Sequence, residues 1–138
     1  MSALSSLALI ALAAPAALMG ASHLKTRKLA REARQLVPPI GQFCNTVQGK
    51  IHYIDLGPRD AQPLVLIHGL SGQLQHFTYA LAEALAKDHR VIAVDRPGCG
   101  YSTRASDAMA RLPEQAKTLL EVLDKLQVHQ PVLVGHSL

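Results

Sequence analysis

The sequence predicts an α/β domain with a largely parallel sheet, and three observations support this prediction. Short apolar runs at 63–69, 90–95 and 131–137 have the length and composition of strands buried on both faces. Stretches with helical spacing separate these runs, and strands that alternate with helices form parallel sheets. The composition, 49% hydrophobic and 17% charged, is that of a globular or partly membrane-embedded chain and excludes a disordered one.

The chain opens with a long apolar segment. Residues 3–21 contain no Asp, Glu, Lys or Arg, and the run approaches the ~20 residues that cross a bilayer as a helix, although Pro15 interrupts it. A signal peptide would begin with a positive region, and a soluble core helix would show a polar face. We therefore predict a signal anchor, a single transmembrane helix over residues 1–22, with these two as the alternatives.

A basic stretch follows directly. Residues 23–34 carry five basic residues and one acidic residue, so this stretch alone has the chain's formal charge of +4. A local patch of this kind excludes a basic face for nucleic acid and marks a membrane boundary. The positive-inside rule places it, and the domain behind it, on the cytoplasmic side. Residues 23–39 are predicted as a basic juxtamembrane helix and linker, which lies on the membrane or continues the anchor until Pro38-Pro39 ends it.

The predicted domain occupies residues 40–138 and begins with a hairpin over 42–57, turning at Gln48-Gly49. A helix is expected over 76–87 and another from Pro113 onward. The residues expected on their buried faces are Phe77, Leu81, Ala84 and Leu85 in the first, and Leu119, Leu120, Leu123 and Leu126 in the second. Cys44 and Cys99 are too few for a disulfide framework or a metal cluster, so both are expected as buried or half-buried thiols.

The tripeptide Gly135-His136-Ser137 carries the strongest chemical signal. A serine at the sharp turn that leaves a strand is a candidate nucleophile, and small flanking residues relieve crowding in that turn. We therefore expect that a side chain larger than that of Gly135 would collide with the backbone of this turn. The alternative is a buried strand that ends in these three residues by chance.

Two further motifs follow the earlier strands in the same order. His68-Gly69-Leu70 begins the segment HGLSG, and Asp95 begins DRPGCGYS, whose Pro, Gly98 and Gly100 indicate a tight loop. With VGHSL and the hairpin QGKIHYIDLG, residues 42–138 resemble the N-terminal part of an α/β-hydrolase of the lipase, esterase and C–C-hydrolase type. Agreement of three motifs disfavours an unrelated α/β domain.

The resemblance implies a role for each motif. Ser137 would be the nucleophile, and the N–H groups of Leu70 and Leu138 would hold the oxyanion, with Gly69 allowing close approach. His68 and His136 would be structural, as would the loop with Asp95, Gly98, Gly100 and Ser102, because the family's acid and base follow the nucleophile in the chain. Relatives that open epoxides or remove halides carry aspartate at this position, so Ser137 favours cleavage of an ester, thioester, amide or C–C bond.

The resemblance also implies that the triad's acid and base lie beyond residue 138. We therefore expect a fold truncated after the nucleophile strand, inactive as it stands, whose full-length form hydrolyses a small acyl substrate. The alternative is a non-enzymatic, membrane-tethered binding module on the same scaffold. Nothing in the sequence calls for a cofactor, and the remaining histidines (His23, His52, His76, His89, His129) lack metal-ligand spacing.

Overall fold

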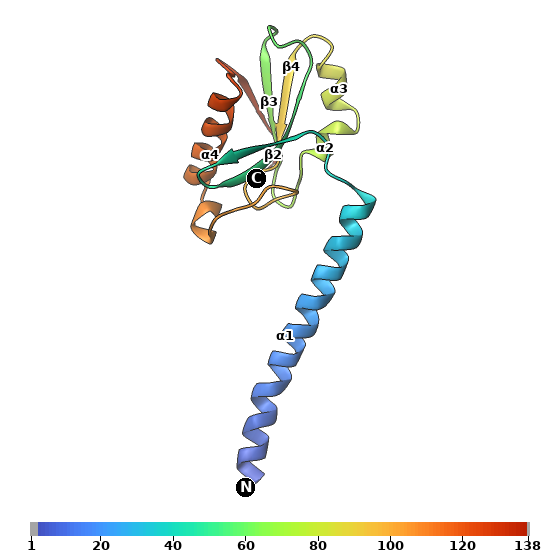
Figure 1. Cartoon of the computed structure of the whole chain (residues 1–138), viewed down its shortest axis with the longest axis vertical. Helices are drawn as coiled ribbons and strands as arrows, with labels where there is room; N and C mark the ends of the chain where they lie inside the picture. Colours follow the sequence, from blue (N-terminus) through green and yellow to red (C-terminus); the bar gives the residue numbers. More distant parts are fainter. Residues whose placement is uncertain (1–2, 138) are drawn as a thin grey trace. The chain divides into compact units, whose positions relative to one another are not determined.

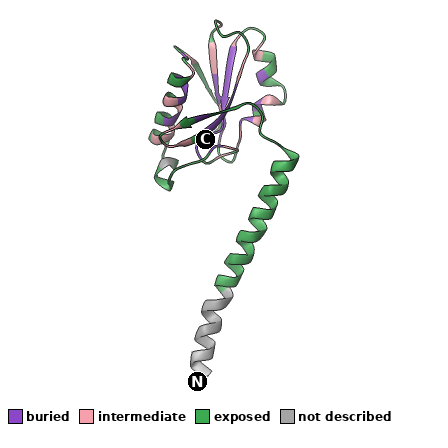
Figure 2. Ribbon diagram, in the orientation of Figure 1, coloured by how far each residue is buried: buried purple, intermediate pink, exposed green. Residues whose placement is uncertain are grey.

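The computed structural model describes the backbone of residues 3–137 and, from residue 15 onward, the side chains of all of these except Met109. The chain divides into two compact units, residues 1–39 and 40–138. The first contains one helix, α1 (Ala3–Leu36), which continues through Pro15 and ends just before Pro38-Pro39, as expected. Its described side chains, from Pro15 to Leu36, are exposed (Figure 2).

The predicted membrane-crossing anchor is not found in the structure. Among the described residues, no helix is both long enough and apolar enough to span a bilayer. Residues 1 and 2, which belong to the predicted span of 1–22, lie outside the described part of the chain, as do the side chains up to residue 14.

The second unit is built on a five-stranded mixed sheet (Figure 1). The predicted hairpin is confirmed, since its two strands pair antiparallel from Gln42 opposite Tyr53 to Thr46 opposite Gly49. The three predicted apolar strands run parallel to one another. In the order β1-β2-β4-β3-β5, the strands are β1 (Gln42–Thr46), β2 (Gly49–Leu56), β4 (Arg90–Val94), β3 (Pro63–Ile67) and β5 (Val132–Gly135).

Helices cover both faces of this sheet, as Figure 1 shows. On one face lie α2 (Gln75–Thr78) and α3 (Leu81–Leu85), and on the other lies α4 (Leu112–Lys125), preceded by the 3₁₀ turn η1 (Asp107–Ala110). Successive strand residues point to opposite faces, so Leu66 joins the core under α2 and α3 while Val65 joins the core under α4. All five residues of β4 are buried, as predicted for a central parallel strand.

Two predicted helix faces are partly wrong. The helix expected over 76–87 is broken into α2 and α3 because Ala80, with φ −154°, leaves the helical region. The break resets the helix face, so Ala82 is buried while Leu81 is 45% exposed. In α4, Val122 is buried and Leu120 is 61% exposed, because two residues along a helix point to nearly opposite sides.

The strand before the predicted nucleophile is also more exposed than expected. The run 131–137 was predicted to be a strand buried on both faces that truncation after it would leave at an unpaired apolar edge, and in the described sheet β5 is an edge strand that pairs with β3 alone. Val132, Leu133 and Val134 are 49%, 58% and 38% exposed. Burial of an apolar strand needs neighbours beside it and layers above and below it, and the pattern of residues within the strand does not supply them.

Candidate active site

The three motifs meet at one edge of the sheet. Strands β4, β3 and β5 are parallel neighbours, so their carboxyl ends lie side by side. The segments that leave these ends begin at Asp95, His68 and His136 respectively. Ligands of open α/β sheets bind outside the carboxyl ends of the strands, which makes this edge the candidate site.

Ser137 adopts the backbone conformation of a sharp strand exit. It lies two residues after the end of β5 and has φ 58°, in the left-handed region that residues other than glycine rarely enter. A conformation of this kind costs about 1–3 kcal/mol and is found most often at functional sites. His136 just before it donates its N–H to the Ile67 carbonyl at 3.0 Å, which ties the turn to the end of β3.

The loop after β3 touches this turn at Gly69. A Cβ added there would lie 2.6 Å from the His136 carbonyl oxygen and 2.8 Å from the Ser137 Cβ, distances that no side chain tolerates. Gly69 therefore lets two segments 68 residues apart come into contact. The crowding predicted at Gly135 is not found within the described residues, because a Cβ there would meet nothing within 4 Å.

Of the two predicted oxyanion donors, Leu70 lies within the described part of the chain. The Leu70 side chain is 80% exposed, so the site would use this residue through its backbone N–H and not through its side chain. Ser71, the next residue in the chain, has φ 57°, and Gln127 and Gln130 are left-handed as well. Leu138 lies outside the described residues.

His68 has the environment of a structural histidine. Its Nδ1 donates to the Gly69 carbonyl at 2.8 Å, and its Nε2 accepts the Arg96 N–H at 3.0 Å. These partners require the neutral ring with the proton on Nδ1. Burial lowers the pKa of His68, which favours the same neutral form. Because both ring nitrogens are bonded to the backbone, His68 is not placed to take a proton from Ser137.

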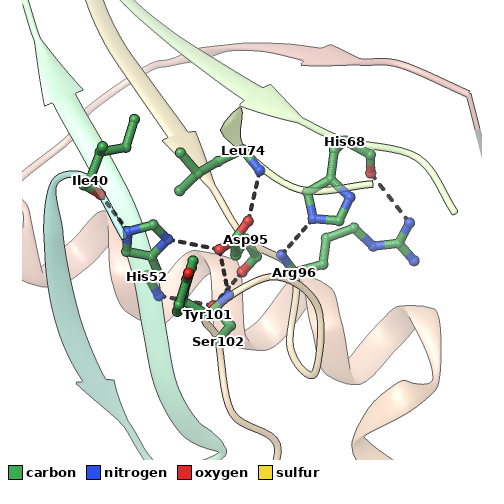
Figure 3. A network of polar contacts seen from close by, with 8 residues as sticks. All are labelled: Ile40, His52, His68, Leu74, Asp95, Arg96, Tyr101 and Ser102. Carbon is green, nitrogen blue, oxygen red and sulfur yellow. Dashed lines mark hydrogen bonds and ion pairs between the residues drawn. The ribbon is translucent and has the colours of Figure 1, made fainter. Parts of the chain in front are cut away.

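Asp95 joins the loops that follow β3 and β4 (Figure 3). Its carboxylate is 1% exposed and accepts the N–H of Leu74 at 2.7 Å and that of Tyr101 at 2.8 Å. Gly100, with φ 51°, lies so close that an added Cβ would collide with this carboxylate, and Gly98 has φ 80°. The Asp95 carbonyl accepts the Ser102 hydroxyl at 2.8 Å. Asp95, Gly98, Gly100 and Ser102 thus shape the loop that follows β4.

An apolar cavity of about 290 Å³ lies between α4 and the sheet. Ile67, Leu119, Leu133 and Ser137 are among the residues that line it, so the candidate nucleophile borders an apolar surface. Within the described residues, no group of three His, Cys, Asp or Glu side chains could hold a metal ion. Cys44 is buried and Cys99 is half-buried, both as free thiols.

Comparison with known protein families identifies the family of the second unit. The family described as "alpha/beta hydrolase fold" matches residues 62–138, from β3 to the end of the chain. The chain belongs to the α/β-hydrolase fold family. In this chain, the segments HGLSG, DRPGCGYS and, as far as Ser137, VGHS lie at the carboxyl ends of β3, β4 and β5.

Several relatives in the α/β-hydrolase fold are similar in sequence. The esterase YbfF of Escherichia coli is 38% identical over 76 residues, which cover 55% of this chain and 29% of that protein. The dihydrolipoyllysine-residue acetyltransferase component of the acetoin cleaving system of Pseudomonas putida is 39% identical over 88 residues, 64% of this chain and 23% of the relative. The chain thus spans about a quarter of the length of these two relatives.

Solved structures show the same fold. The Cif epoxide hydrolase of Acinetobacter nosocomialis superposes with a TM-score of 0.63 at 27% identity, over 71% of this chain and 30% of that one. A membrane phospholipase A superposes with a TM-score of 0.66 at 22% identity, over 97% of this chain and 43% of that one. The second likeness concerns the fold alone.

The sequence did not point to His52 as part of this α/β-hydrolase site. His52 lies in β2, fully buried, with its Nδ1 2.7 Å from the Asp95 carboxylate, which is 43 residues away in the chain. A single histidine within a strand carries no local signal of such a contact. Ile51, His52, Tyr53 and Ile54 of β2 are all buried, so no alternation singles out His52, and only the pairing of β2 with β4 brings it to Asp95.

Proposed function

We propose that this chain contributes the nucleophile and the oxyanion loop of a serine hydrolase that acts on an ester or similar acyl bond of a small molecule. Ser137 attacks the acyl carbonyl, and the backbone N–H groups of Leu70 and Leu138 hold the oxyanion. The observation that carries this proposal is the left-handed Ser137, with φ 58°, in contact with Gly69 of the oxyanion loop.

Among the relatives, the esterase favours an acyl substrate, and the serine at position 137 separates this chain from epoxide and halide chemistry. The solved structures include epoxide hydrolases and a haloalkane dehalogenase. A serine nucleophile gives an acyl-enzyme that water can release, which suits ester cleavage better than epoxide or halide chemistry. The triad's acid and base belong, by this proposal, to the remainder of the catalytic domain, since His68 is committed to backbone partners.

A fluorophosphonate identifies the nucleophile directly. Such a reagent reacts with an activated serine, so peptide mass spectrometry of the treated, complete gene product is expected to find the adduct on Ser137. Ser102, buried and bonded to the Asp95 carbonyl, and the exposed Ser106 serve as internal controls. An adduct on either of these, with Ser137 unmodified, would overturn the assignment.

The Leu70 N–H is tested by a matched pair of substitutions. Leu70→Pro removes the N–H and is expected to slow fluorophosphonate labelling by roughly 10²–10³-fold, the usual effect of losing one oxyanion donor. Leu70→Ala keeps the N–H and shortens an exposed side chain, so labelling at the wild-type rate is expected. Equal rates in the two variants would remove Leu70 from the oxyanion hole.

We also propose that the N-terminal segment attaches the protein to a membrane. In the described part of α1, Arg27, Arg31 and Arg34 share one side of the helix, while Leu29, Ala33 and Leu36 share the other. All six are exposed. Lys25 and Glu32 also fall on the side of Leu29 and Leu36, so the attachment rests on the cationic side, which suits the surface of a bilayer that contains anionic lipid. The single-pass anchor and the cytoplasmic orientation remain part of this proposal.

Vesicle sedimentation tests the attachment. The full chain is expected to sediment with vesicles of phosphatidylcholine and phosphatidylglycerol. Replacing Arg27, Arg31 and Arg34 by Gln should weaken binding by roughly 10²-fold, because each basic residue near an anionic surface contributes about 1 kcal/mol. The control replaces the exposed Arg59, Lys87 and Arg111 of the second unit, an equal change in charge. Equal losses in the two variants would contradict the proposal. Binding that survives high salt would indicate insertion as an anchor.

A further inference from the structure

His52 and Asp95 form a buried polar contact beside the candidate site. We propose that these two residues form a buried imidazolium–carboxylate pair that positions the oxyanion loop, residues 68–74. The positioning role rests on the function proposed above, whereas the charge state of the pair does not. Figure 3 shows His52 on β2 facing Asp95, which reaches from the end of β4 toward Leu74.

The partners of His52 call for a proton on both ring nitrogens. Nδ1 lies 2.7 Å from the Asp95 Oδ2, and Nε2 contacts the Ile40 carbonyl oxygen. A carbonyl oxygen and a carboxylate can only accept, so both nitrogens act as donors, which only the protonated ring allows. His52 is fully buried, and a buried cation needs a partner of opposite charge within reach.

The surroundings of Asp95 place the negative charge on its carboxylate. Oδ1 accepts the Leu74 N–H at 2.7 Å, and Oδ2 accepts the Tyr101 N–H at 2.8 Å together with the His52 ring. Backbone N–H groups that converge on a carboxyl group favour its ionised form. If the proton stood on Asp95 instead, Oδ2 would donate to Nδ1 and still accept the Tyr101 N–H, but the two backbone N–H groups on the carboxyl group favour its ionised form, so we assign the proton to His52.

The other groups around His52 leave Asp95 as its counter-ion. The Phe43 ring of β1 lies 4.9 Å from the imidazole, and the Tyr101 ring lies edge-on at 5.4 Å. Lys50 Nζ lies over the Phe43 ring at 4.3 Å from its centroid, so a cation approaches the same ring that contacts the imidazole. Ser102 accepts the backbone N–H of His52 at 2.9 Å, which fixes the strand and not the ring.

The pair connects three parts of the domain to the oxyanion loop. Through the Ile40 carbonyl it reaches the first residue of the second unit, and through Asp95 it reaches the loop that closes at Tyr101. The hydrogen bond from the Leu74 N–H to Asp95 holds the last residue of the loop 68–74, just before α2 begins at Gln75. Without the imidazolium, the buried carboxylate would lose its counter-ion, and the loop that carries Gly69 and Leu70 would loosen.

His68 provides a control for the charge state within the same protein. Its ring accepts one N–H and donates one, so it is neutral and carries its proton on Nδ1. Two histidines, each 2% exposed or less, are therefore expected in opposite states at the same pH. The difference follows from their partners, because His52 faces two acceptors and His68 faces one acceptor and one donor.

Nitrogen NMR of the full chain, labelled with ¹⁵N in histidine, tests the pair at pH 7. We expect both ring nitrogens of His52 to carry a proton and His68 to carry one on Nδ1 alone. A neutral His52 ring would overturn the proposal. This measurement involves no hydrolysis, so a protonated His52 combined with an unreactive Ser137 would refute the proposed function and leave the pair intact.

Hydrogen exchange of the variant His52→Gln tests positioning. The amides of Leu74 and Tyr101 are expected to exchange about tenfold faster than in wild type, while the sheet amides of Val65 and Ile92 keep their rates. The control is His129→Gln, at an exposed position after α4, which should change none of the four. Uniform acceleration of all amides, or no change at Leu74, would refute a positioning role. If the variant does not fold, the nitrogen spectrum of the wild type still decides the charge state.

Discussion

Replacing Ser137 by alanine is expected to reduce ester hydrolysis by the complete gene product by roughly 10⁶-fold, the loss seen when a serine nucleophile is removed from a working triad. The reason is chemical and not structural. Ser137 is exposed and its side chain supports no part of the core, so the variant should keep the stability of the wild type. Hydrolysis of a short-chain p-nitrophenyl ester, measured beside thermal unfolding, separates the two effects.

The control for this experiment is Ser106→Ala, an exposed serine in the loop before η1. It should hydrolyse the ester at the wild-type rate. Wild-type activity in Ser137→Ala would show that the reaction uses another nucleophile. Loss of activity accompanied by unfolding would instead show that the left-handed turn at Ser137 depends on the serine hydroxyl.

Asp95→Asn is expected to lower the free energy of unfolding by about 3–5 kcal/mol, because it removes the charge of one partner in a buried ion pair and leaves the other uncompensated. The change also replaces one carboxylate oxygen by an NH2 group, a donor, at a point where Leu74, Tyr101 and His52 already donate. Two donors that face each other in a buried site repel, so part of the hydrogen bonding is lost as well. Urea denaturation followed by circular dichroism measures the change.

Asp107→Asn is the matched control, since it makes the same chemical change in a different setting. Asp107 accepts a bond from Arg104 at 2.8 Å, a distance close to that of Asp95 from His52, but its side chain is 99% exposed. Solvent screens such a pair, so its loss should leave the unfolding midpoint where it was. Equal midpoints for Asp95→Asn and the wild type would show that the buried network contributes little to stability.

Much of the architecture follows from local pattern. The β-branched runs around Val65 and Ile92 have no polar face, which predicts central parallel strands because burial on both sides leaves no room for one. Pro38-Pro39 ends α1 because proline can neither donate in a helix nor tolerate helix before it. The order of three glycine-containing turns after three strands predicts which residues gather at one edge, and the family match agrees with that order.

The remaining errors occur where a residue's surroundings decide its state. Leu120 and Val122 are equally apolar, yet only Val122 meets the sheet, because the rotation of α4 depends on how it docks. The apolar strand β5 is exposed because strand position is a property of the assembled sheet. The anchor over 1–22 was predicted from hydropathy and from the flanking charges, and no membrane-crossing helix is found among the described residues.

For the site, the sequence by itself determined which residue types leave the strands: Ser137 after β5, Gly69 and Leu70 after β3, and Asp95 after β4. These positions follow from covalent order and from the rule that parallel strands end at one edge. Tertiary structure alone decided that Ser137 is left-handed, that Gly69 touches it, and that His52 faces Asp95 across 43 residues. Each of these depends on contacts between distant segments, which no local pattern encodes because the pairing of strands creates them.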